Sequence, residues 1–186
     1  AGIGLQPALS PKGGRKSPKN YKHDHYYSME EIMQLHTKDY GVIDYEEKDL
    51  FHFPDGLFGF SEVQHYLPLC LNEEEDSTIL LLQGVENPDV AFVVINPFSL
   101  DPDYAPNLTD EELTYLGVKD AEDLSYYVTC VLQADYLDNT VNLKCPLVIN
   151  PENHKGMQVI LEASGYEYKH TLGSFESVQA KQKAAV

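Results

Sequence analysis

Apolar and polar residues alternate along most of the chain in short runs separated by turn sequences. Residues 32–36 alternate in this way, and residues 42–45 do so again after the turn signal Asp39-Tyr40-Gly41, which predicts a β-hairpin. Runs 90–95 and 128–132 are apolar at consecutive positions, so we expect both to lie in the core and 90–95 to be a fully buried central strand. Similar runs predict strands at residues 50–53, 66–71, 78–85, 126–134, 140–143, 147–150 and 157–161.

One helix interrupts this β-rich pattern. Thr109-Asp110-Glu111-Glu112 forms a capping box, in which the Thr109 hydroxyl accepts from the third helical amide and Glu112 reaches back. Gly117 marks the end of the helix, and residues 120–123 predict one further helical turn. Eight to ten short strands with one or two short helices predict a mainly β fold, a small antiparallel β-barrel-like single domain.

The two ends of the chain lack this periodicity. Residues 1–28 are rich in Pro, Gly, Ser and Lys, which predicts a basic tail that is either disordered or an artificial extension, with Met29 as a natural start. Residues 29–172 form the expected domain. Residues 173–186 are expected to be a C-terminal tail, which is either helical or disordered.

The chain is strongly acidic, with a net charge of −17. Residues 1–28 contain five of its 13 basic and one of its 30 acidic residues, so residues 29–186 carry a net charge of −21. Such a surface repels phosphate backbones and attracts basic proteins, so we expect no direct nucleic-acid binding. Solubility alone would also explain the charge.

No motif of an enzyme or metal site is present. The chain lacks phosphate-binding glycine loops, a GxSxG elbow, an HExxH helix and CxxC pairs, so we expect no catalytic residue, metal or cofactor. His23-Asp24-His25 suggests metal affinity, but in a flexible tail such a cluster is usually incidental. A pair such as Cys145 with His170 has no local signature of a site. The absence of an 18-residue apolar span and of a signal segment, with three scattered cysteines, predicts a cytoplasmic protein that does not bind membranes.

Two loops are more informative. Residues 53–60 combine two glycines with apolar side chains, as either a tight corner whose aromatic rings plug the barrel end or an exposed apolar patch for a partner. Asn96-Pro97-Phe98 presents the same two alternatives, because Pro stops a strand and Asn caps a turn.

From about Met29 to His170 the chain resembles the flagellar assembly factor FliW family. The resemblance rests on four motifs in order: F-x-x-G-L-x-G-F at residues 53–60, N-P-F at 96–98 with Asp101 and Tyr104, T-x-N-L-x-x-P-L-V-I-N at 140–150, and G-x-Q-x-I-L at 156–161 with Tyr166 and His170. Two departures are mild: Cys145 stands where Ala is common, and Lys169 where Arg is common.

The resemblance implies a regulatory binding protein without catalysis. Proteins of this family bind the translational repressor CsrA, a small RNA-binding dimer, and relieve its repression of flagellin mRNA. They also bind flagellin, and newly made flagellin frees CsrA, which is a partner switch. The resemblance favours allosteric over competitive action on RNA binding.

Two other function classes stay open: an export chaperone that binds only flagellin, and a small hydrolase. A deep polar cleft with convergent His, Cys or carboxylates would favour the hydrolase. Because interfaces favour aromatic side chains, we expect apolar anchors on the loops and acidic side chains beside them. The predicted partner-binding residues are Phe58, Phe98 and Tyr104 as anchors, with Glu73, Glu74, Asp101 and Asp103 as electrostatic contacts.

Overall fold

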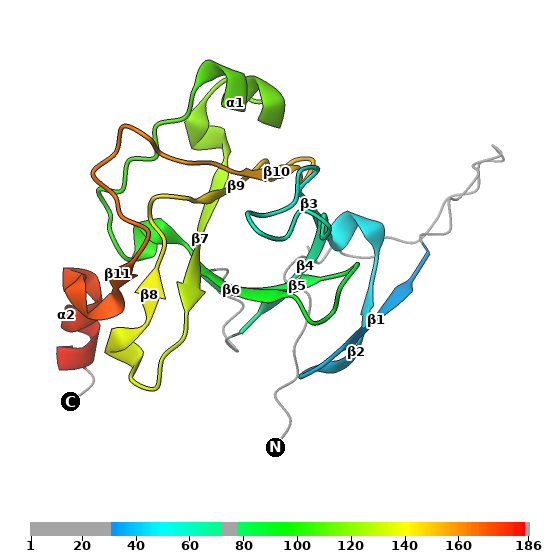
Figure 1. Ribbon diagram of the computed structural model, residues 1–186, viewed down its shortest axis with the longest axis horizontal. Coiled ribbons are helices and arrows are strands. Elements are labelled where there is room, and N and C mark those ends of the chain that lie inside the picture. Colours follow the sequence, from blue (N-terminus) through cyan, green and yellow to red (C-terminus); the bar gives the residue numbers. More distant parts are fainter. Residues whose placement is uncertain (1–30, 72–77, 185–186) are drawn as a thin grey trace, which may run out of the picture.

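The computed structural model describes residues 31–71 and 78–184, which form eleven strands and two α-helices with short 3₁₀ turns between them (Figure 1). The elements are β1 (Met33–Thr37), β2 (Gly41–Tyr45), β3 (Phe51–His52), β4 (His65–Cys70), β5 (Ile79–Gly84), β6 (Ala91–Ile95), α1 (Asp110–Leu116), β7 (Ser125–Val131), β8 (Thr140–Val141), β9 (Leu147–Ile149), β10 (Gly156–Gln158), β11 (His170–Thr171) and α2 (Glu176–Ala184). Glu73 and Glu74, two of the predicted electrostatic contacts, lie outside the described residues.

Nine strands form one antiparallel sheet in the order β10-β9-β7-β6-β5-β4-β3, with β8 and β11 continuing from the far half of β7. The two ends of this path come together at a single point, where His52 of β3 forms a parallel bridge with Lys155. There the His52 N–H donates to the His154 carbonyl at 3.0 Å. The predicted mainly β, antiparallel fold is confirmed, but the sheet is not closed by a ladder, so barrel-like describes it only loosely.

The β1–β2 hairpin is a separate two-stranded sheet, as the turn signal at 39–41 predicted. Its alternation is visible in the burial: Leu35 and Ile43, which are cross-strand partners, are both buried, and the flanking residues are exposed or half-buried. These two side chains share a cluster with Leu67 and Leu69 of β4, so the hairpin covers one face of the main sheet.

Two further apolar clusters fill the main sheet. The larger one gathers side chains from β6, β7 and β9 and includes Leu116 of α1 and Val178 of α2. Residues 176–184 form helix α2, so the helical alternative is the one that the C-terminal segment adopts there. The helix packs on the core through Val178, which is 6% exposed. The second cluster contains Phe53 and Tyr66, both 0% exposed, at the end where β3 meets β10.

The predicted helix is confirmed in detail. Thr109 accepts from the Glu112 amide, Glu112 accepts from the Thr109 amide, and Gly117 ends the helix at φ 78°. The further turn appears as a 3₁₀ helix at Ala121–Asp123. The side-chain-to-backbone bonds at Thr109 and the positive φ of Gly117 decide the two ends of α1, which is why sequence neighbours were enough to predict them.

Three expectations about strands were wrong. β6 is central, but Ala91 is exposed and Phe92 and Val93 are half-buried. β7 pairs with residues 93–95 and does not extend along Ala91 and Phe92. The run 128–132 leaves the core where β7 ends, and its last two residues, Val131 and Leu132, are 55% and 61% exposed. The strand expected over 157–161 stops at Gln158, and β11 was not predicted because two residues carry no periodicity.

Candidate protein-binding surface

The loop at residues 53–60 satisfies both of its alternatives at once. Phe53 and Leu57 are 0% and 4% exposed and plug the end of the sheet, whereas Phe58 is 53% exposed. Gly56 has φ +66°, and a Cβ there would lie 2.5 Å from the Ser61 Cα, so only glycine fits this close approach. The loop thus anchors itself in the core and leaves one aromatic ring on the surface.

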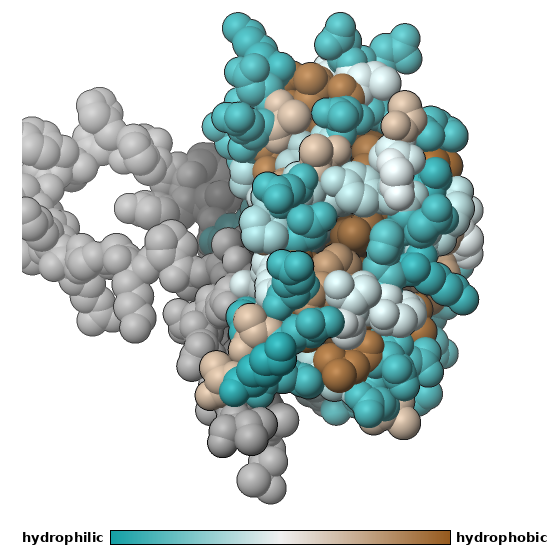
Figure 2. All heavy atoms as spheres, turned by 90° about the vertical axis from the view of Figure 1, so that its left-hand side faces the viewer, coloured by the Kyte–Doolittle hydropathy of each residue, from teal (hydrophilic) through white to brown (hydrophobic). Residues whose placement is uncertain are grey.

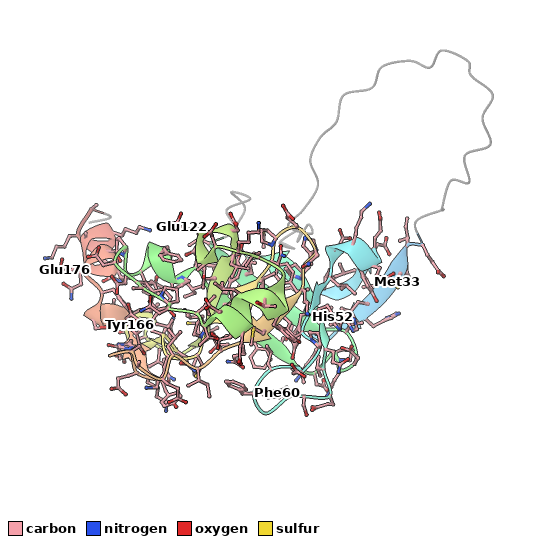
Figure 3. All side chains as sticks on the ribbon, turned by 90° about the horizontal axis from the view of Figure 1, so that it is seen from above. Met33, His52, Phe60, Glu122, Tyr166 and Glu176 are labelled. Atoms are coloured by element: carbon pink, nitrogen blue, oxygen red, sulfur yellow. The ribbon has the colours of Figure 1, made fainter. Side chains whose placement is uncertain are left out.

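The loop projects from one side of the molecule. Seen from above, Phe60 lies at the tip of that projection, on the side opposite Glu122, and Tyr166 lies toward the same side (Figure 3). The Phe60 ring packs edge-to-face on Phe92 at 5.0 Å between centroids. Phe60, two residues after Phe58, is therefore held against β6.

The turn after β6 presents a second aromatic ring. The Asn96 side chain accepts from the Phe98 amide at 3.0 Å and so shapes the turn, as its residue type predicted. Phe98 is 39% exposed and packs edge-to-face on Tyr104 and Tyr126, with centroids 5.6 Å and 5.7 Å away. Its outer edge is available to a partner while two buried rings fix its orientation.

Tyr104 differs from the exposed anchor that we expected. It is 4% exposed, and its hydroxyl donates to the Leu143 carbonyl at 2.8 Å. Burial, with the nearby Tyr166 and Tyr126 hydroxyls, raises the pKa of Tyr104 far above its usual value. Its ring is inaccessible, so in this conformation Tyr104 supports Phe98 from below and does not offer a contact surface.

The acidic residues beside this turn are accessible. Asp101 is half-buried and accepts the Asp103 amide on its carboxylate at 3.0 Å, and Asp103 is exposed. Both stay predictions as electrostatic contacts. No ring contact joins Phe58 to Phe98 within residues 31–71 and 78–184, so the structure does not assemble the two exposed rings into one patch.

A third group of exposed apolar side chains was not predicted from the sequence. It consists of Val131, Leu132 and Tyr136 on the connection from β7 to β8, each more than half exposed. Tyr136 also lines a cavity of about 220 Å³ beside α2, together with Ile95 and Val178. No sequence signal reveals the group, since the apolar run outlasts the strand pairing, which ends at Val131.

The face that carries α2 is mixed in character. In Figure 2 brown apolar patches on this face are small, separate and surrounded by teal polar side chains. That distribution suits contacts through individual side chains better than contacts through one broad apolar area.

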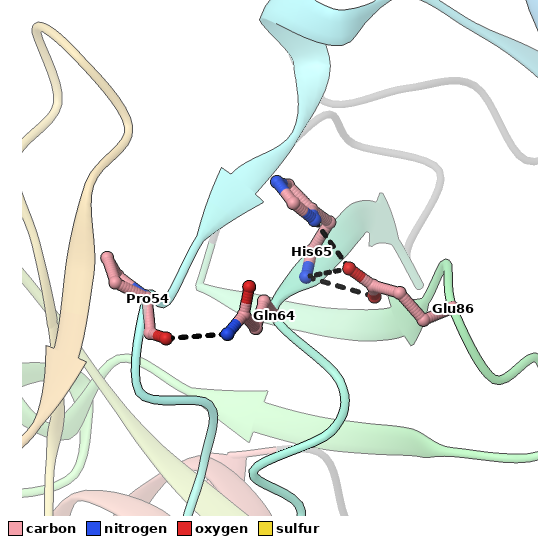
Figure 4. A network of polar contacts seen from close by, with 4 residues as sticks. All are labelled: Pro54, Gln64, His65 and Glu86. Atoms are coloured by element: carbon pink, nitrogen blue, oxygen red, sulfur yellow. Dashed lines mark hydrogen bonds and ion pairs between the residues drawn. The ribbon is translucent and has the colours of Figure 1, made fainter.

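A cavity of about 670 Å³ lies between the hairpin side and β3. His52 and His65 line it with their rings stacked at 4.6 Å, and His65 pairs with Glu86 (Figure 4). Burial and the His65 imidazole lower the pKa of His52. Burial alone would raise the pKa of Glu86, but the hydrogen bonds from His65 and the backbone outweigh it and lower that pKa. Neighbouring Gln64 donates to the Pro54 carbonyl at 2.7 Å.

This cavity gathers two imidazoles and several carboxylates, so it is a candidate for the polar cleft that a hydrolase would need. Its described lining residues are Glu31, Met33, Glu46, Glu47, Lys48, Leu50, His52, His65 and Asn153, which include no hydroxyl or thiol nucleophile. No group of three potential metal ligands exists within the part of the chain that the structure describes. The cavity therefore offers imidazole and carboxylate groups but no activated nucleophile.

The pair Cys145 and His170 does not form such a site either. Cys145 is 2% exposed, and burial raises the pKa of its thiol, so the thiolate is disfavoured. The His170 ring accepts the Glu167 amide at 2.9 Å, which assigns it a role in the turn. Cys130 and Cys145 are both buried, as expected for small apolar residues.

Within the described residues, no helix is long and apolar enough to cross a membrane. The fold and its surface define a class: an antiparallel β domain with isolated aromatic side chains held outward on tight turns. The FliW protein family model matches residues 34–172. The chain belongs to the FliW family of flagellar assembly factors.

Curated relatives agree with this assignment. A flagellar assembly factor FliW of Caldanaerobacter subterraneus is 40% identical over 140 residues, covering 75% of this chain and 93% of the relative. One from Clostridium botulinum is 35% identical, covering 75% and 96%. A crystal structure of the flagellar assembly factor FliW aligns with a TM-score of 0.69 and 36% identity, over 75% of this chain and 96% of the other. The family resemblance of the motifs is thereby confirmed.

Proposed function

We propose that this chain is a non-enzymatic regulatory protein that binds and antagonises CsrA, and that it binds flagellin in a partner switch controlling flagellin translation. Its place of action is the cytoplasm, where translation is regulated. The proposal rests on membership of the FliW family and on the partners that the family resemblance implies. Flagellin and CsrA exclude one another, so free flagellin returns CsrA to its mRNA.

One observation carries the proposal physically: Phe58 and Phe98 are exposed on turns whose backbones are hydrogen-bonded, and the neighbouring Leu57 and Pro97 are buried. Aromatic anchors held in this way lose little side-chain entropy on binding. The net charge of −21 over residues 29–186 complements a basic RNA-binding protein and speeds its encounter. Asp101 and Asp103, beside the Phe98 turn, are the proposed charged contacts within the described residues.

Calorimetric titration of the whole chain tests the proposal. CsrA is titrated first, then flagellin, and then flagellin is added to the preformed CsrA complex. Displacement of CsrA by flagellin is the expected result. Binding of flagellin alone would establish the export chaperone, and binding of neither would refute the proposal and return attention to the cavity at His52 as a hydrolase site.

Two variants locate the contacts. Phe58→Ala and Phe98→Ala should each weaken one of the complexes by at least about fivefold, since an anchoring aromatic ring contributes more than about 1 kcal/mol. Val42→Ala is the matched control, because Val42 is 52% exposed on β2 and lies in none of the four motifs. If both Phe variants fold and bind both partners unchanged, the assigned anchors are incorrect. Adding CsrA-bound RNA to the titration separates allosteric from competitive action.

A further inference from the structure

Gln158 bonds to two other segments of the chain, one of them distant in the sequence. Its side-chain carbonyl accepts the Phe58 amide at 2.8 Å, across 100 residues. Its side-chain amide donates to the Cys145 carbonyl at 3.3 Å. The residue itself is half-buried at the end of β10, so a single side chain ties the exposed loop to the turn before β9.

The Phe58 amide has little else to hold it. Inside the loop, Gly56 donates to the Phe53 carbonyl and Phe60 donates to the Leu57 carbonyl, at 2.8 Å and 2.7 Å. These bonds fix the residues on either side of Phe58. Gly59 has φ +84°, and a Cβ placed on it would meet nothing within 4 Å, so the outer end of the loop is not packed. Among the described residues, the bond to Gln158 is therefore the hydrogen bond that attaches the Phe58 backbone to another strand.

We propose that Gln158 is the positioning residue of the binding surface: by holding the Phe58 backbone it presents the exposed ring in one orientation to the protein partner. The inference rests on the proposed function, which supplies the partner. A loop that is already ordered before binding loses less conformational entropy on binding than a free loop would. Without the bond, the Phe58 ring would still be present but would no longer be held in one orientation.

The donor and acceptor ends of Gln158 can be separated by substitution. Gln158→Met keeps the length of the side chain and removes both hydrogen bonds. Gln158→Glu keeps an oxygen that accepts the Phe58 amide and loses the donor to the Cys145 carbonyl. Gln179→Met is the matched control, because Gln179 likewise donates to a backbone carbonyl, that of Gly173 at 2.8 Å, but does so at α2.

Two measurements on the full chain test the inference. The first is hydrogen exchange of the Phe58 amide by NMR; the second is the calorimetric affinity for CsrA and flagellin. Gln158→Met should speed exchange at Phe58 by about tenfold and weaken the complex that uses Phe58 by about three- to tenfold, which corresponds to one lost neutral hydrogen bond. Gln158→Glu should restore slow exchange, and Gln179→Met should change neither quantity.

A Phe58→Ala background gives the decisive comparison. If Gln158 acts through Phe58, Gln158→Met should weaken binding no further in that background. Unchanged Phe58 exchange in Gln158→Met would overturn the inference, and so would faster exchange with unaltered affinity. If the unaltered chain binds neither partner while exchange at Phe58 responds as stated, the proposed function fails and the positioning of Phe58 by Gln158 stands.

Discussion

Gly156→Ala should destabilise the protein because the two ends of the sheet meet at this glycine. A Cβ on Gly156 would lie 2.6 Å from Cε1 and 3.0 Å from both Cδ1 and Cζ of Phe53. Phe53 is 0% exposed and packs edge-to-face on Tyr66, also 0% exposed, at 5.8 Å, so its ring has no free space into which to move. Gly156 does not have a positive φ, so the effect isolates packing from backbone strain.

The expected magnitude follows from two opposing effects. Overpacking a full core costs about 1–3 kcal/mol. Replacing Gly by Ala at a compatible backbone angle stabilises the protein by about 0.4–1 kcal/mol, because Ala lowers the conformational entropy of the unfolded chain. The free energy of unfolding should therefore fall by about 1–2 kcal/mol, and the melting temperature by about 3–6 °C for a chain of this size.

Urea unfolding followed by circular dichroism measures this change. An unchanged slope of the unfolding free energy against urea concentration would show that the substitution does not alter the compactness of the unfolded state. Gly165→Ala is the control, because its Cβ would meet nothing within 4 Å and its φ is not positive. It should be neutral or stabilising. Phe53→Leu combined with Gly156→Ala should cost less than the sum of the two single changes. If Gly156→Ala proves as harmless as Gly165→Ala, the close meeting of β3 and β10 is refuted.

Three further predictions concern single side chains. Tyr104→Phe removes the donor to the buried Leu143 carbonyl and should lower the unfolding free energy by about 1–2 kcal/mol in the same urea assay, and no change would contradict the assigned bond. Thr109→Ala removes the helix cap and should cost about 1 kcal/mol, with helix α1 losing amide-exchange protection first. Because the pKa of His52 is lowered in the folded protein, the unfolded chain binds more protons, and the free energy of unfolding should fall as the pH drops below about 6.5. The lowered pKa of Glu86 should extend this loss of stability below about pH 4.5. His52→Gln should flatten the upper part of this dependence in urea unfolding measured at successive pH values; an unchanged slope would refute it.

Short-range features were readable from the sequence because neighbouring residues decide them. The hairpin at β1–β2 follows from strict alternation around a glycine turn, and the ends of α1 follow from Thr109 and Gly117. The order of the four motifs was enough to indicate the family. Asn96 was readable as a turn former because its side chain bonds its own turn.

Burial and long-range contacts belong to the tertiary structure. Leu132 is as apolar as any core residue, yet it is exposed, because exposure depends on where the partner strand ends. Tyr104 was expected on the surface but is covered, since its hydroxyl finds a carbonyl 39 residues away. Alternation specifies which side chains share a face of a strand and leaves open which faces are covered.

The proposed binding surface shows the same division. From the sequence alone Phe58 was identifiable as a candidate anchor, because two glycines flank an apolar run. That its neighbours Phe53 and Leu57 would be buried while Phe58 stays exposed depended on how the loop meets the end of the sheet. The bond from Phe58 to Gln158 spans 100 residues and exists only because β3 and β10 are brought together. Bringing them together costs chain-closure entropy, which burial of the surrounding apolar core offsets. No local sequence pattern encodes this contact.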